Sequence, residues 1–147
     1  MKPRLPLHAL FVHFPVVLWT VATLLDLAAS ALPAPAPLIA SYALIAGTAM
    51  ALPALMTGLG EATRLPKGHP AWRATYLHLG LTALAFALYL ACLLLRVADL
   101  AAAPTALAIV LSATGFAALS VGGHIGARLV YFAGVGVTRS SPEGSHR

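Results

Sequence analysis

Four long runs of hydrophobic residues follow one another along the chain, separated by short stretches rich in proline, glycine and charge. They cover about residues 7–31, 38–58, 73–96 and 105–127. Each run reaches the roughly 20 residues that a helix needs to cross the hydrocarbon core of a bilayer. None alternates like a barrel strand, and a segment in lipid must satisfy its own backbone hydrogen bonds. The pattern therefore predicts an all-α fold, an integral membrane four-helix bundle.

The composition points to the same class of protein. Of the 147 residues, 60% are hydrophobic and only 9% are charged, and the mean hydropathy is +0.88. A soluble domain of this length cannot bury so much apolar surface, which excludes a soluble globular protein. We expect one transmembrane domain over residues 1–147, with a polar tail at 138–147 and no internal repeat. Because further apolar runs follow the first one, we do not expect it to be a cleaved signal peptide.

Basic residues are concentrated on one predicted side of the membrane. Eight of the nine Lys and Arg residues fall at the N-terminus, in the second connection or in the C-terminal part: Lys2, Arg4, Arg64, Lys67, Arg73, Arg128, Arg139 and Arg147. Arg96 alone falls on the opposite side. Basic residues favour the cytoplasmic side, so we expect both termini in the cytoplasm and a multi-pass protein of a bacterial inner membrane.

Histidines stand near the cytoplasmic ends of three predicted helices, and ionisable groups in such segments usually mark function. His13 lies about six residues into the first helix, His78 about five into the third, and His124 near the end of the fourth, so their depths agree within about one turn. His8 and His13 differ by about 140° around a helix, so they do not both face one site. We expect the deeper His13 to pair with His78, and His8 to be an interfacial or proton-handling residue.

Small and polar residues recur at helical spacing on three predicted helices. The second helix carries a small-residue stripe, Ala40, Ala43, Gly47, Ala51, Ala54 and Gly58. This stripe indicates either close helix packing or a flat wall for a planar cofactor at Gly47, Ala51, Ala54 and Gly58. The third helix carries a polar stripe, His78, Thr82, Ala85, Tyr89, Cys92 and Arg96. On the fourth we expect one interior side with Ala113, Ala117, Ser120, His124 and Tyr131.

Imidazole ligands limit which metal or cofactor such a site can bind. Neutral imidazole binds haem iron, copper and zinc, whereas magnesium and calcium prefer oxygen ligands, and few carboxylates lie near these histidines. Four-helix bundles hold cofactors between facing side chains, so we predict haem b with His13 and His78 as axial ligands and His124 as an alternative. Two alternatives stay open: a copper or zinc binding or transport protein with a site of His13, His78 and His124, and a non-catalytic scaffold subunit whose histidines only pack. No hydrolase or phosphate-loop motif is present, which favours an electron-transfer or binding protein over a stand-alone enzyme.

Both ends of the chain carry motifs of a known family. The first helix opens with His8 to Pro15, the third has His78 near its start, and the chain closes with the glycine-rich stretches 122–131 and 134–137. Over nearly the whole length these features resemble a bacterial membrane family catalogued as domain of unknown function 2231, although Ala9 stands where that family usually has proline. The resemblance implies that the protein occurs together with redox modules such as Rieske-type or cytochrome c domains, and therefore that it serves in electron transfer. Besides the lipid bilayer, the expected partner is a redox protein or a quinol. A homo-oligomer is also possible.

Overall fold

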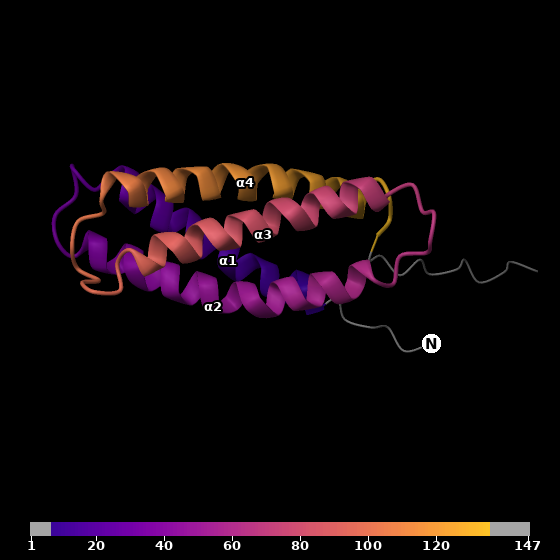
Figure 1. Cartoon of the computed structure of the whole chain (residues 1–147), viewed down its shortest axis with the longest axis horizontal. Coiled ribbons are helices and arrows are strands. Elements are labelled where there is room, and N and C mark those ends of the chain that lie inside the picture. The colour runs from indigo at the N-terminus through magenta and orange to yellow at the C-terminus, as the bar shows by residue number, and fades with distance from the viewer. Residues whose placement is uncertain (1–6, 136–147) are drawn as a thin grey trace, which may run out of the picture.

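The computed structural model describes residues 7–135, which form four helices and their connections. The helices are α1 (Leu7–Leu27), α2 (Ala36–Ala62), α3 (Trp72–Leu94) and α4 (Ala106–Tyr131), and they form an elongated bundle (Figure 1). Each is long and apolar enough to cross a membrane, which confirms the four predicted spans. No strand occurs between residues 7 and 135, so the all-helical class is confirmed for this part of the chain. The polar tail at 138–147 lies outside the described residues.

The helix ends differ from the prediction near prolines and glycines. α1 ends at Leu27, and turns over residues 28–31 lead into Pro33, because a residue before proline disfavours the α conformation. α2 instead continues past Gly60 to Ala62, and α4 continues to Tyr131, each four residues further than predicted. A glycine costs a helix only about 1 kcal/mol, whereas an unpaired backbone group in lipid costs several. Continuing the helix therefore costs less free energy than ending it.

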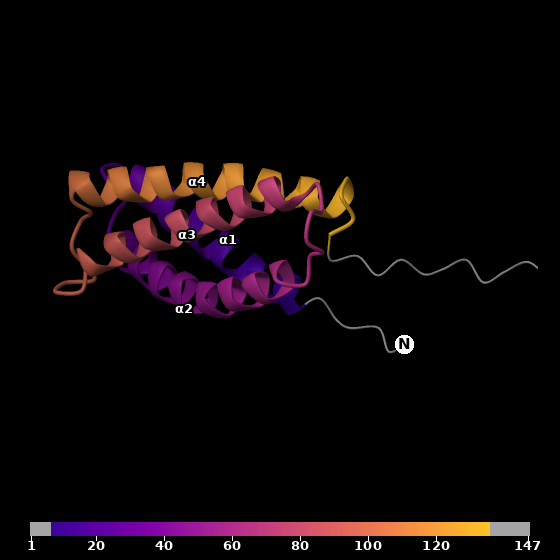
Figure 2. The same cartoon turned by 45° about the vertical axis from the view of Figure 1, so that its right-hand side comes forward.

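The four helices are arranged as two hairpins that run in the same direction (Figures 1 and 2). α1 packs mainly against α2 and α3 mainly against α4, whereas fewer contacts join α2 to α3 and α1 to α4. The starts of α1 and α3 lie at one end of the bundle with the ends of α2 and α4 (Figure 1). We call this the His end, because His8 and His78 lie there. The α1–α2 and α3–α4 connections form the opposite end, called the Asp–Arg end after Asp26 and Arg96.

Two stacked aromatic rings form the centre of the core. Trp19 of α1 and Tyr89 of α3 stack with ring centroids 4.5 Å apart, and both side chains are buried. Each ring lies against a glycine of its own hairpin, since a Cβ at Gly47 would lie 2.8 Å from Trp19 and one at Gly115 would lie 3.1 Å from Tyr89. Glycines thus make room for the rings between the helices. At Gly47 the small-residue stripe serves close packing.

The two hairpins repeat one pattern of contacts, although the sequence was expected to contain no repeat. His78 and Tyr89 in α3 follow His8 and Trp19 in α1 by 70 positions (8 to 78, 19 to 89), and the partners of their rings repeat as well. The repeated pairs are His8 and His78, Trp19 and Tyr89, Gly47 and Gly115, Ala54 and Gly122, and Gly58 and Gly126. Few other paired positions keep the same residue, so residue identity alone hides the repeat.

Candidate intramembrane histidine site

One face of α1 points into the bundle. Its residues recur every three or four positions: His8, Val12, Pro15, Trp19, Ala22 and Asp26. His13 lies off this face, about 140° from His8. The rotation that separates the two histidines therefore brings His8, and not His13, into the interior.

His8 and His78 are held in the same way. Nδ1 of His8 lies 2.9 Å from the carbonyl oxygen of Ala54 in α2, and Nδ1 of His78 lies 2.8 Å from that of Gly122 in α4. A carbonyl oxygen only accepts, so each Nδ1 carries a proton and donates it. In the neutral ring the lone pair is then on Nε2, which has no hydrogen-bond partner among residues 7–135. Metal-ligating histidines usually have this arrangement, with one nitrogen fixed by an acceptor and the other free.

Both histidines line one cavity of about 50 Å³ between the hairpins. The rest of its wall is almost entirely apolar: Val12, Pro15, Val16, Trp19, Ala54, Leu55, Gly58, Leu79, Thr82 and Leu119. Thr82 donates its hydroxyl to carbonyls of its own helix, those of His78 and Leu79. The two imidazoles are therefore the groups through which this cavity can hold a polar ligand.

The family model described as predicted membrane protein (DUF2231) matches residues 4–139. The chain belongs to this family. The matched region includes both cavity histidines, and it confirms the resemblance carried by the opening His8–Pro15 motif and the closing glycine-rich stretch. No curated protein and no solved structure matches the chain.

The other predicted ligands do not reach the cavity. The side chains of His13 and His124 are exposed on the outside of the bundle. Nδ1 of His13 lies 2.6 Å from the carbonyl oxygen of Ala9, one turn back in the same helix. The structure thus corrects the expected pairing, because His8 rather than His13 shares a cavity with His78. Depth along a helix does not fix the direction in which a side chain points.

Two of the four predicted wall residues of α2 line the cavity. Ala54 and Gly58 line the cavity, whereas Gly47 and Ala51 are buried in the core. The polar stripe of α3 does face the interior, but the predicted side of α4 is corrected, since Ala117, Ser120, His124 and Tyr131 are exposed. The interior of α4 has small residues where rings from α3 must fit, with Gly115 against Tyr89 and Gly126 against His78. The buried residues of α4 are Ala108, Ser112, Gly115, Ala118, Leu119, Gly122 and Leu129.

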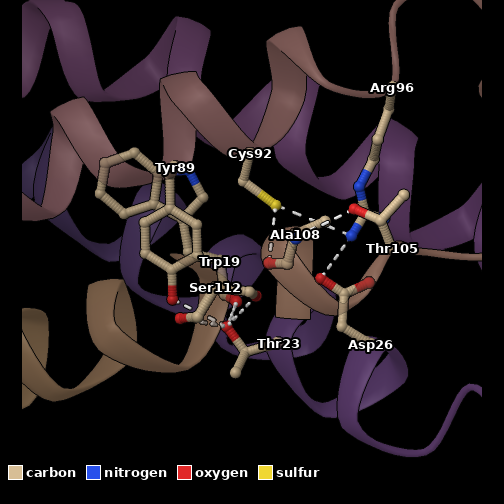
Figure 3. Close-up of polar contacts among 9 residues, drawn as sticks. All are labelled: Trp19, Thr23, Asp26, Tyr89, Cys92, Arg96, Thr105, Ala108 and Ser112. Carbon is tan, nitrogen blue, oxygen red and sulfur yellow. Dashed lines mark hydrogen bonds and ion pairs between the residues drawn. The ribbon is translucent and has the colours of Figure 1, made fainter. Parts of the chain in front are cut away.

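A second polar cluster lies at the Asp–Arg end (Figure 3). Nη2 of Arg96 donates to Oδ2 of Asp26 at 2.7 Å, and the two side chains are 4% and 1% exposed. Oγ1 of Thr23 accepts from the Ser112 hydroxyl at 3.0 Å and lies 2.8 Å from the Tyr89 hydroxyl. These contacts join α1 to α3 and α4, so they tie the two hairpins together.

The position of this cluster makes the bundle asymmetric. Within residues 7–135, every side-chain hydrogen bond that crosses between the hairpins lies in this cluster. At the His end, each histidine bonds only to its own hairpin. The Asp26–Arg96 pair was not predicted from the sequence. Two opposite charges near the same end of two apolar runs were the signal that could have found it, because such charges are seldom left unpaired in a membrane.

The donor set and the volume limit what the cavity can hold. No group of three or more His, Cys, Asp or Glu side chains among the described residues is placed to hold a metal ion. Two imidazoles suit an iron that takes four ligands from a porphyrin and two from the protein. A cavity of about 50 Å³ is far smaller than an ordinary small-molecule pocket, about 300 Å³ or more. The two histidine ligands therefore suit a haem iron, whereas the cavity as it stands is too small for the macrocycle.

Proposed function

We propose that this membrane protein binds haem b between its two hairpins, where His8 and His78 would hold the iron, and serves in electron transfer. The observation that carries the proposal is the pair of Nδ1-protonated imidazoles, one from each hairpin, that line one apolar cavity. An acceptor on Nδ1 fixes the ring and raises the basicity of Nε2. Haem supplies one-electron chemistry when bound, and the chain supplies the two nitrogens and the apolar walls.

Binding of a macrocycle requires the hairpins to separate at the His end. The placement of the polar contacts supports such a movement. The cross-hairpin hydrogen bonds and the ion pair lie at the Asp–Arg end, so the His end can widen without breaking them. The bonds that hold each imidazole remain intact as well, because both partners of each bond belong to one hairpin.

We place the His end on the cytoplasmic side of a bacterial inner membrane. Exposed basic residues in the α2–α3 connection and near the end of α4 support this orientation: Arg64, Lys67, Arg73 and Arg128. Arg96 at the other end is buried and paired with Asp26, so it does not weigh against it. A redox protein or a quinol would then exchange electrons with the haem near the basic α2–α3 connection.

The absorption spectrum of the purified protein tests the proposal. The protein is expressed with ample haem precursor, purified in mild detergent, and measured oxidised and reduced. We expect a Soret band, the sharp visible bands of a six-coordinate haem on reduction, and one haem per chain. A protein that is folded by circular dichroism but lacks a Soret band after haem is added back contradicts haem binding.

A bare copper ion is the second candidate, and the cavity volume favours it. A space of about 50 Å³ admits an ion without movement of the hairpins. Zinc usually takes three or four protein ligands, whereas two histidines among residues 7–135 line this cavity. Copper and zinc are separated from haem by elemental analysis. Stoichiometric copper without porphyrin, lost when both His8 and His78 are replaced, supports the copper site and excludes the haem.

A further inference from the structure

The imidazoles of His8 and His78 each occupy the space that a side chain on the neighbouring helix would fill. A Cβ at Gly58 would lie 2.9 Å from Cε1 and 3.1 Å from Nδ1 of His8. A Cβ at Gly126 would lie 2.8 Å from Cε1 and 3.1 Å from Nδ1 of His78. Carbon atoms do not approach ring atoms this closely, so neither imidazole keeps its position beside an alanine.

The spacing of each glycine explains how the ring reaches its acceptor. The accepting carbonyls belong to Ala54 and Gly122, and each glycine follows its carbonyl by four positions in the same helix. A helical side chain covers the turn on the N-terminal side of its own Cα, and the carbonyl four residues earlier lies on that turn. A glycine at this position leaves the carbonyl open to a ring nitrogen from another helix.

Close packing of helices is the ordinary reason for glycine in a membrane helix, but these two positions differ from that case. At Gly58 and Gly126, as at Gly115, the three atoms nearest to a built Cβ all belong to one ring. Of these three rings, the two imidazoles also bond to the carbonyl four residues earlier in the glycine's own helix. At Gly47 the nearest atoms include Cβ of Leu18, as expected for helices in close contact. The repeat of the same arrangement in both hairpins makes a chance contact a poor explanation.

We propose that Gly58 and Gly126 are positioning residues for the two histidines. By lacking a side chain they expose the carbonyls of Ala54 and Gly122, place the ring proton on Nδ1, and leave Nε2 of His8 and His78 as the nitrogen that carries the lone pair. This inference adds detail to the proposed haem site, and the purpose of the positioning rests on that proposed function. The ring geometry, however, is set by the chain alone, so it can be tested without any ligand.

Nitrogen-15 NMR of histidine-labelled, ligand-free protein in bicelles at pH 8 reads the tautomers directly, with His8→Gln and His78→Gln assigning the signals. We expect both rings in the Nδ1-protonated form in the unsubstituted protein. Gly58→Ala should shift His8 to a mixture containing the Nε2-protonated form and leave His78 unchanged, and Gly126→Ala should do the reverse. Gly60→Ala and Gly123→Ala are matched controls in the same helices, because nothing lies within 4 Å of a Cβ there. They should leave both rings unchanged.

Unchanged tautomers in Gly58→Ala and Gly126→Ala, or equal changes in the controls, overturn the proposal. If Gly58→Ala does not fold, the double variant His8→Ala/Gly58→Ala is tested. Recovered folding shows that the alanine clashes with the imidazole. Continued failure to fold shows that Gly58 serves helix packing, which overturns the proposal. In the haem-loaded protein, we expect Gly58→Ala and Gly126→Ala each to weaken haem retention at least tenfold. Expected tautomers without haem binding would refute the proposed function and leave this inference standing.

Discussion

Removing one partner of the Asp26–Arg96 ion pair should destabilise the bundle strongly, while removing both should not. The guanidinium and the carboxylate meet at 2.7 Å, and their side chains are 4% and 1% exposed. Substituting one partner leaves the other charge buried and uncompensated, which typically costs about 3–5 kcal/mol. We therefore expect Arg96→Met or Asp26→Leu to reduce the free energy of unfolding by about that amount, a factor of roughly 10²–10⁴ in the unfolding equilibrium.

The double variant Asp26→Leu/Arg96→Met should recover most of this loss. The pair is incompletely satisfied, since Oδ1 of Asp26 and Nε and Nη1 of Arg96 have no partner among the described residues. Replacing an imperfect buried pair by apolar side chains is often neutral or stabilising, by up to about 4 kcal/mol. The coupling energy between the two substitutions should thus be about 3 kcal/mol or more.

Reversible unfolding in mixed micelles, followed by tryptophan fluorescence and circular dichroism, measures these free energies. Asp99→Asn is the control at the same end of the bundle, because Asp99 is exposed and asparagine keeps an acceptor for the Ala101 amide. It should change stability by less than about 0.5 kcal/mol. Additive losses in the double variant would refute the claim that these two side chains hold the hairpins together.

Three further predictions follow from the bundle. Tyr89→Phe removes the hydroxyl that meets Thr23 at 2.8 Å, and it should reduce the free energy of unfolding by about 0.5–1.5 kcal/mol in the same assay. Gly47→Ala should lower the melting temperature in detergent, since overpacking costs about 1–3 kcal/mol, whereas Gly80→Ala, with nothing near its Cβ, should not lower it. Lys67→Cys, in the α2–α3 connection, should react with an impermeant maleimide in inverted vesicles but not in intact cells; the reverse result would place the His end outside.

The four spans could be predicted from the sequence because lipid imposes one simple condition. A chain segment in the hydrocarbon must be long, apolar and internally hydrogen-bonded, and each of these properties is visible in composition and length. The interior faces of α2 and α3 were predicted for a related reason. In each helix a single stripe, of small residues in α2 and polar residues in α3, differs from the rest of the surface.

The rotation of α1 and α4 could not be predicted in the same way. Their surfaces offer two competing histidine positions, or small residues on several sides, so helical spacing alone does not select a face. The face that each helix turns inward is decided by which pairs of residues fit together. His8 fits against Gly58, and Gly126 makes room for His78. Asp26 also helps to fix the rotation of α1, because it lies on the same face of the helix as His8 and must reach Arg96. A complementary partner, rather than depth, fixes the face.

In the proposed function, His8 and His78 form the intramembrane ligand site. The most direct measurement compares reduced-minus-oxidised spectra and bound haem of four single variants: His8→Ala, His78→Ala, His13→Ala and His124→Ala. We predict that the first two lose the six-coordinate spectrum and most of the bound haem. His13→Ala and His124→Ala should retain both, because their side chains are exposed outside the bundle. Loss of the spectrum in His13→Ala with full retention in His8→Ala would contradict the account.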